Sequence, residues 1–379
     1  MTRRNIAILV LLAVWLTIGS AAAQLDRTYP EVGPGLQYVH ERIGDVPWAI
    51  HVLKIDRQSA DLRLISSLAQ GTIYGLSGIS KHVGAVPADL GTPVAAINGD
   101  FYRIDPGPYQ GDPTGLQIVR GEMVSAPTGP SFWIDSSGKP QIGEVQSQLK
   151  VTWPDGSTTP IGLNEERKDD AAVLYAPILG PSTRTKGGRE MVLERVGDEP
   201  WLPVRPGQTY KARVREVKGE GDTPLSPDTM ILSVGPQLVN APAVVAGDVL
   251  QVTMATSPDL TGVDVAIGGH PILMVKGKLL DFDPKEPRHP RTIIGWDARY
   301  LYFVVVDGRQ KGLSNGMTSG EEASLMMRLG CTDAMNLDGG GSSTFWLGGR
   351  VMNVPSDGRE RGIANALILL RKPETSVAN

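Results

Sequence analysis

Three aspartates stand where chemistry could take place. Asp100, Asp307 and Asp338 each follow a short apolar run and adjoin a glycine. A carboxylate at the end of a buried strand is held rigidly yet faces open space, which suits acid–base or nucleophilic work. Asp-Gly pairs also form turns readily, so any one of the three could serve only that purpose. Three in one chain favour a site, and we predict all three as catalytic candidates.

A run of three glycines follows the last of these aspartates. Gly339, Gly340 and Gly341 are succeeded by Ser342 and Ser343. Each glycine disfavours a regular strand or helix by roughly 1 kcal/mol, so the run needs a reason. Main-chain N–H groups converging on one point, with serine hydroxyls beside them, would suit an anion. The segment lacks the lysine of a Walker loop, and a flexible surface hairpin remains the alternative.

Arginines flank the apolar runs and could hold such an anion. Arg291 precedes one run and Arg361 precedes the last one. A guanidinium can bind a phosphate through two parallel hydrogen bonds, although either arginine could equally form a surface ion pair. His289 and His270 could act in acid–base chemistry, but each adjoins a proline and could be structural.

The elements that position these residues are expected to be strands, with few helices. Apolar runs predict strands at 94–97, 299–306, 334–337, 344–347 and 363–370, and two strands joined by a tight turn at 48–66. Residues 79–86 predict a short helix. A longer helix should begin at Ser319, with a capping box to Glu322, and end at Gly330.

Composition agrees with a chain rich in turns and strands. Gly and Pro make up roughly 20% of the residues, against about 12% in an average protein. Between about 141 and 228 the charge rises and short β-prone runs recur. We therefore predict an α+β fold: a β-rich mixed sheet with few flanking helices and a β-rich inserted subdomain at about 141–228.

The N-terminal segment predicts where the protein is located, and the net charge bears on its partners. Residues 1–23 combine a basic start, a short apolar run and an Ala-x-Ala site, which predicts a signal peptide and a mature domain over 24–379. The protein is then periplasmic or secreted, with no stable membrane insertion. A net charge of −4 gives no reason to expect nucleic acid. The single cysteine, Cys331, is expected to be a buried thiol.

Six segments together resemble the phosphodiester glycosidase family. They are Ala96–Tyr102, Gly268–Pro271, Pro290–Thr292, Val306–Arg309, Asn336–Thr344 and Glu360–Leu367, and they occur in the family's order. The resemblance spans nearly the whole mature chain. A further stretch, Leu163 to Glu165 and Ser182 to Thr185, is similar to bacterial members with extra β-structure. His270 departs from the pattern, because many members have a small residue there.

The resemblance implies a hydrolase that cleaves a sugar-1-phosphodiester at the anomeric carbon, acting on phosphorylated carbohydrate of the cell envelope or a polysaccharide. One or two of the aspartates would act at the sugar. The predicted substrate-binding residues are Asn98, Gly269, His289, Arg291, Thr292, Arg309, Gly339, Gly340, Gly341, Ser342, Ser343, Arg361 and Asn365.

Two alternatives stay open. Clustered aspartates could bind Ca²⁺ or Mg²⁺, but arginines alongside favour a phosphate, so no metal or other cofactor is predicted. The chain could also be a non-catalytic binder of phosphorylated or acidic glycans. Intact aspartates favour the enzyme, because a binder has little need of all three.

Overall fold

Strands dominate the computed structural model, which describes residues 31–373. The predicted signal peptide lies outside the described residues. Strands pair antiparallel in three sheets, with one parallel pair between β11 (Gly162–Leu163) and β12 (Ala172–Tyr175). Within residues 31–373 no helix is long and apolar enough to cross a bilayer. The predicted α+β class, β-rich with few helices, is confirmed.

The first sheet has eight strands and carries half of the predicted site segments. In order across the sheet they are β1 (Glu31–Gly33), β2 (Leu36–Ile43), β3 (Trp48–Asp56), β21 (Tyr300–Val306), β20 (Arg291–Trp296), β22 (Asp333–Asn336), β18 (Ile272–Val275) and β19 (Lys278–Leu279). β21 is the expected central strand, and it is buried on both faces from Leu301 onward.

The second sheet has five strands and packs against the first. They are β24 (Arg350–Val351), β23 (Phe345–Leu347), β5 (Thr92–Asn98), β25 (Asn365–Arg371) and β4 (Leu62–Leu68). Leu53 and Phe303 of the first sheet share a buried core with Ile97 and Leu367 of the second. Strand ends from both sheets therefore meet along one edge of this double layer.

Two short α-helices cover the outer faces of the double layer. α2 (Ser319–Arg328) buries Leu325 and Met326 against the eight-stranded sheet, and α1 (Ile79–Gly84) packs on the five-stranded one. Cys331 is buried under α2, as expected. The 3₁₀ turns are η1 (Ala69–Gly71), η2 (Ala88–Leu90), η3 (Pro177–Leu179) and η4 (Gly340–Ser342).

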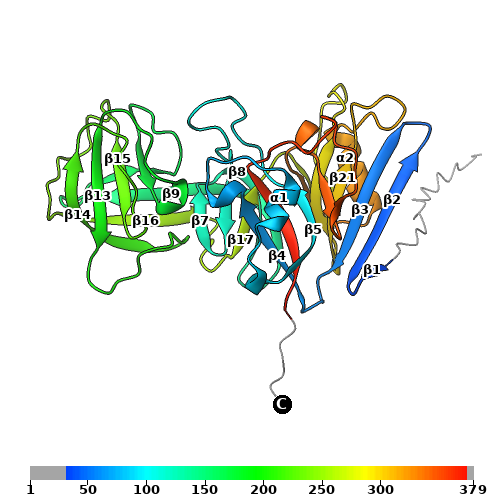
Figure 1. The fold of residues 1–379 in the computed structure, drawn as a ribbon, viewed down its shortest axis with the longest axis horizontal. Helices are drawn as coiled ribbons and strands as arrows, with labels where there is room; N and C mark the ends of the chain where they lie inside the picture. The colour runs from blue at the N-terminus through cyan, green and yellow to red at the C-terminus, as the bar shows by residue number, and fades with distance from the viewer. Residues whose placement is uncertain (1–30, 374–379) are drawn as a thin grey trace, which may run out of the picture.

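The third sheet has twelve strands and extends away from the double layer (Figure 1). They run β11 (Gly162–Leu163), β12 (Ala172–Tyr175), β15 (Met230–Val234), β13 (Arg189–Arg195), β14 (Thr209–Lys218), β16 (Val249–Ser257), β9 (Pro140–Thr152), β8 (Thr128–Ile134), β17 (Val265–Gly268), β6 (Gln117–Val119) and β7 (Glu122–Ser125), with β10 (Thr158–Pro160) on β9. Strands β9 to β16, drawn in green, form what we call the β-rich lobe. The predicted insertion falls within it, and its boundaries stay a prediction.

The two strands expected at 48–66 exist as β3 and β4, and the expected turn joins them, with Ser59 N donating to Asp56 O and Leu62 N to Ser59 O; the two strands belong to different sheets. The predicted capping box was wrong in its residues. The capping box uses Thr318 and Glu321 in place of Ser319 and Glu322. Both pairs have the required spacing, and the fold selects the first because Glu322 is turned inward and fully buried.

Candidate functional site

The site lies where strands of the two packed sheets end. Asn98, the last residue of β5, is fully buried and joins the sheets. Its amide nitrogen donates to the carbonyl oxygen of Asp338 at 2.6 Å, while its amide oxygen accepts from Thr292 Oγ1 at 2.7 Å and Thr344 N at 3.1 Å. A buried side chain that hydrogen-bonds to three separate segments fixes their relative position.

Asp100 is held in place by the main chain around it. Its carboxylate accepts from Phe101 N at 2.7 Å and from Gly115 N at 2.8 Å, and its own N–H donates to Asn365 Oδ1 at 2.8 Å. Only 4% of the residue is exposed. Burial raises the pKa of Asp100 to about 7, and the nearby Asp338 adds to the rise. The two N–H groups oppose that rise without cancelling it.

Asp338 is the more open of the two carboxylates. The main chain links it to Asp100, because Asp338 N donates to Gly99 O at 2.9 Å. Burial raises the pKa of Asp338 to about 6, while Ser342, Gly339 N and the charge of Arg361 lower it. Ser342 lies close enough for this effect, although its hydroxyl makes no hydrogen bond of ordinary geometry within the described residues. Two neighbouring carboxyl groups therefore titrate near neutrality, which is common at functional sites.

The three glycines let two arginines lie against the loop. Gly340 has a φ of +62°, which favours glycine, and a Cβ there would lie 3.0 Å from an Arg309 nitrogen. A Cβ on Gly341 would lie 2.2 Å from Arg361 Nη2, and one on Gly339 2.7 Å from Pro290 O. A side chain at any of these positions would displace a neighbour, so the sequence run has a steric cause.

Arg309 and Arg361 therefore bring two positive charges to the glycine loop. Arg309 is exposed and lies 3.1 Å from His289 Nδ1. Arg361 is partly exposed and pairs through Nε with Asp357 at 2.8 Å. Burial and then the charges of Arg309 and Arg291 lower the pKa of His289, so this ring is neutral near pH 7. The arrangement can attract an anion to the loop.

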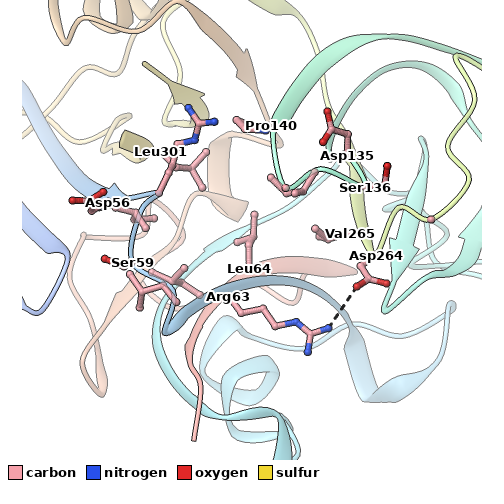
Figure 2. A pocket seen from close by; sticks show the side chains of 17 residues that line it. Asp56, Ser59, Arg63, Leu64, Asp135, Ser136, Pro140, Asp264, Val265 and Leu301 are labelled. Carbon is pink, nitrogen blue, oxygen red and sulfur yellow. Dashed lines mark ion pairs between the residues drawn. The ribbon is translucent and has the colours of Figure 1, made fainter. Parts of the chain in front are cut away.

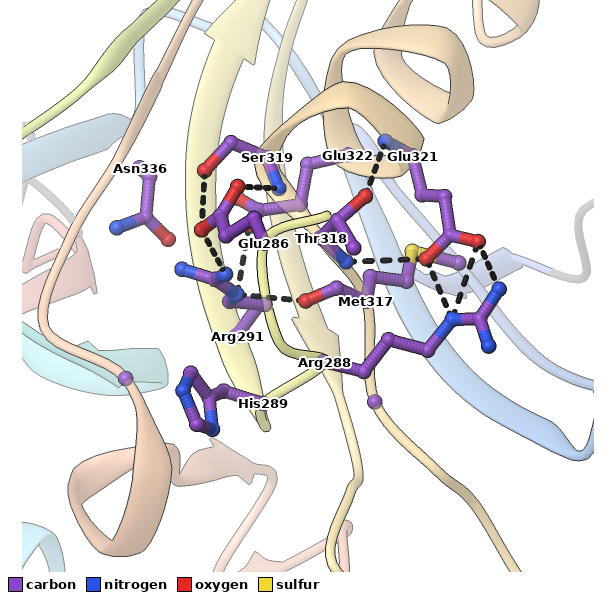
Figure 3. Close-up of polar contacts among 12 residues, drawn as sticks. Glu286, Arg288, His289, Arg291, Met317, Thr318, Ser319, Glu321, Glu322 and Asn336 are labelled. Atoms are coloured by element: carbon purple, nitrogen blue, oxygen red, sulfur yellow. Dashed lines mark hydrogen bonds and ion pairs between the residues drawn. The ribbon is translucent and has the colours of Figure 1, made fainter. Parts of the chain in front are cut away.

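Arg291, unlike Arg309 and Arg361, pairs with buried or partly buried glutamates (Figure 3). Its Nη2 pairs with Glu286 at 2.6 Å, and its Nε lies 2.8 Å from both Met317 O and Glu322 Oε1. Glu322 is fully buried, and burial raises its pKa to about 8 against the lowering effect of Arg291. The guanidinium is thus engaged by two protein carboxyl groups, those of Glu286 and Glu322, and its predicted role in binding an anion stays a prediction.

Asp307 belongs to a second cluster. Its Oδ1 accepts from Asn353 Nδ2 and Val354 N, both at 3.0 Å, and its Oδ2 lies 3.5 Å from His51 Nε2. Asn353 also donates to Ser343 O at 3.0 Å. Asp307 therefore contacts the glycine loop through Asn353. Its predicted catalytic role stays a prediction.

Gly269 and Asn365 lie at the same strand ends. A Cβ on Gly269 would lie 2.7 Å from Asn336 O, so the glycine permits close backbone approach. Asn365, at the start of β25, accepts a hydrogen bond from Asp100 N through Oδ1. Its Nδ2 donates to Gln117 Oε1 at 3.2 Å. The exposed His270 ring stacks on Phe101 at 4.7 Å between centroids.

Several residues of the site were not predicted as such. Tyr102 donates to Gly362 O at 2.7 Å, lies near Ser342 and Asp338, and has its pKa raised by burial. Asn353, Asp357 and Glu286 hold predicted residues in place. Tyr102 lies in a segment that carries the family resemblance, whereas no sequence signal marks the other three.

One cavity lies away from this site. Its volume is about 360 Å³, and its lining includes Asp56, Arg63, Asp264 and Leu301 (Figure 2). These positions stand at the opposite ends of the strands from Asn98, Val306 and Asn336. The candidate site is defined instead by carboxylates, arginines and a glycine loop. Among residues 31–373, no group of three or more His, Cys, Asp or Glu side chains is arranged to hold a metal ion.

Comparison with known proteins gives a consistent result. Residues 211–370 match the model of the phosphodiester glycosidase domain. The predicted site residues from Gly269 to Asn365 fall within the match, and Asn98 and Asp100 precede it. Over 83 residues the chain is 40% identical to the SPbeta prophage-derived protein YomE of Bacillus subtilis (strain 168). Over 68 residues it is 38% identical to N-acetylglucosamine-1-phosphodiester alpha-N-acetylglucosaminidase of Bos taurus.

These alignments are short. They cover 22% and 18% of this chain, and 13% and 12% of the two relatives. Two solved structures share the fold more widely. A Synechocystis protein has a TM-score of 0.70 at 20% identity, covering 89% of this chain and 62% of its own. A Burkholderia pseudomallei K96243 protein has a TM-score of 0.63 at 23% identity, covering 86% and 74%.

Proposed function

This chain belongs to the phosphodiester glycosidase family, and from that premise we propose that it is an exported hydrolase cleaving a sugar-1-phosphodiester at the anomeric carbon. The substrate would be phosphorylated carbohydrate of the cell envelope or a polysaccharide. One observation carries the proposal: Asp100 and Asp338, both with a raised pKa, adjoin a glycine loop flanked by Arg309 and Arg361.

The two carboxyl groups suit different roles. Above a pKa of about 6, Asp338 is ionised and can act at the anomeric carbon as nucleophile or base. Below a pKa of about 7, Asp100 keeps its proton and can share it with the departing oxygen. Each role needs the protonation state that its surroundings favour near neutrality.

The arginines suit the leaving group. A phosphate needs little protonation as it departs, but its charge must be matched. Arg309 and Arg361 lie against Gly340 and Gly341, where guanidinium groups can bind phosphate oxygens. We propose that these arginines neutralise the phosphate and that turnover needs no metal.

Chromogenic sugar-1-phosphodiesters test the reaction class. The proposal expects release of a free sugar and a phosphomonoester, at an unchanged rate in EDTA. Binding without either product would support the alternative, a non-catalytic binder of phosphorylated or acidic glycans. The two carboxyl groups with raised pKa favour the enzyme, because acid–base chemistry at the anomeric carbon needs such a pair and binding alone does not.

Export rests on the N-terminal segment. The basic start and the Ala21-x-Ala23 site lead us to propose cleavage before Gln24 and a periplasmic or secreted protein. N-terminal sequencing of protein recovered outside the cytoplasm should read from near Gln24. A mature chain that retained residues 6–16 would contradict this part of the proposal.

A further inference from the structure

Both ends of one loop close on Asp100. We call residues 101–115, between β5 and β6, the site loop. Its first residue donates through Phe101 N to Asp100 Oδ1, and its last through Gly115 N to Asp100 Oδ2. Gly115 and Gly268 also pack so closely on this carboxylate that a Cβ on either would lie under 3 Å from Oδ2. The burial of Asp100 therefore depends on how the site loop is held.

The site loop folds back on itself and leaves its tip exposed. Thr114 N donates to Phe101 O, and Arg103 N to Asp112 O, both at 2.9 Å. From Arg103 to Pro108 every residue is exposed. A tip of this kind, containing Gly and two prolines, opens easily unless something outside the loop fixes it.

The β-rich lobe supplies that contact. Arg184 Nη1 donates to Pro108 O, and Tyr109 OH donates to Arg184 O at 2.8 Å. The Arg184 guanidinium lies 4.9 Å from the centre of the Tyr74 ring, and Arg103 forms an ion pair with Glu166. The last pair is exposed and contributes little, so Arg184 is the main contact between lobe and loop.

Arg184 is itself held in an uncommon conformation. Its φ is +57°, in the left-handed region that arginine seldom occupies. Thr183 and Thr185 on either side donate to the fully buried Glu190, at 3.2 Å and 2.8 Å. Such a conformation persists only where the surroundings impose it, and it often marks a functional position. The Ser182 to Thr185 segment thus has a structural role that its family resemblance alone did not explain.

We propose that Arg184 is a positioning residue for Asp100, acting through the site loop. The inference rests on the proposed function, because it concerns the proton held by one of the two candidate catalytic carboxyl groups. With the tip anchored, Phe101 N and Gly115 N stay on the carboxylate and water stays away from it. With the tip released, water reaches Asp100 and favours its charged form.

The sign of the effect follows from burial. Burial raises the pKa of Asp100, so hydration lowers it, and the proton is lost at lower pH. Asp338, after β22, is a charged group that acts on Asp100. The other titratable and charged groups on the segments that contact Asp100 are Arg361 before β25, His270 after β17, and Tyr102, Arg103, Asp105 and Asp112 on the site loop. Burial raises the pKa of Asp112 to about 8, so it needs a control of its own.

The test compares Arg184→Ala with Arg189→Ala. Arg189 lies in the same lobe and donates to Ala241 O and Pro242 O, at 2.8 Å and 2.9 Å, away from the site loop. In the pH profile of kcat/KM, Arg184→Ala should move the basic limb to lower pH by about 0.5–1 unit, whereas Arg189→Ala should not. Tyr109→Phe, which removes one hydroxyl, should shift the limb less in the same direction. Asp112→Asn should leave it in place.

Hydrogen exchange provides a readout without turnover. The amides of Phe101 and Gly115 should exchange about tenfold faster in Arg184→Ala than in the parent or in Arg189→Ala. Unchanged exchange at both amides would overturn the inference, whether or not the protein is an enzyme. Faster exchange in a protein that turns over no sugar-1-phosphodiester would support the positioning role and overturn the proposed function instead.

Discussion

Asn98 donates to the carbonyl oxygen of Asp338 at 2.6 Å, across 240 positions of sequence. This bond joins the last residue of β5 to the segment that follows β22, and the two strands belong to different sheets. It also brings Asp338 beside Gly99, next to Asp100. The two carboxyl groups are neighbours because two sheets pack together, so the pair is a property of the fold.

A bell-shaped pH dependence follows from this pair. Asp338 should be ionised above about pH 6, and Asp100 should keep its proton below about pH 7. Turnover needs both states, so kcat/KM should peak between these values and fall on either side. Because the groups interact, the two limbs report the pair as a unit. A rate that stayed flat from pH 5 to 8 would contradict this assignment; the ionic strength should be held constant throughout.

Arg361 should control the binding of inorganic phosphate. Phosphate should inhibit competitively in the millimolar range, about −4 kcal/mol, as expected for a lone anion. Arg361→Ala should raise the inhibition constant about tenfold, because a charge-assisted contact is lost. Arg361→Lys should restore only part of it. Arg359→Ala, two positions earlier and exposed, is the matched control. An inhibition constant unchanged in Arg361→Ala would move the anion away from the glycine loop.

Arg291 should matter to stability more than to phosphate. Arg291→Ala would leave the buried Glu322 side chain and the carbonyl oxygen of Met317 without their hydrogen-bond donor, and should destabilise the fold by about 1–3 kcal/mol. Arg288 is the control: it pairs with Glu321 at the surface, where such a pair contributes about 0–1 kcal/mol. Denaturant unfolding of both variants measures the difference. If Arg291→Ala kept parental stability but lost phosphate inhibition, the original assignment of Arg291 to the anion site would hold.

Local patterns predicted the strands and the glycine loop well. The run at 299–306 forms β21. Glycine is required from Gly339 to Gly341 because Pro290, Arg309 and Arg361 leave no room for a side chain there. These features depend on short stretches of sequence, which carry their own periodicity and turn preferences.

Long-range partners could not be predicted in the same way. Asp307 meets His51 only when β21 pairs with β3, and Arg291 meets Glu322 only when α2 packs on the eight-stranded sheet. The sheet to which a strand belongs could not be predicted either: β3 and β4 are adjacent in sequence but lie in different sheets. The capping box moved by one residue because Glu322 serves Arg291 from inside the protein. No spacing rule contains that information.

The most direct measurement is the turnover of a chromogenic sugar-1-phosphodiester by the parent and by Asp338→Asn. The change keeps the size of the side chain and removes its charge, so turnover should fall about 100-fold or more while circular dichroism stays unchanged. Asp264→Asn, at the distal cavity, should behave as the parent. A folded Asp338→Asn protein with parental turnover would contradict the account.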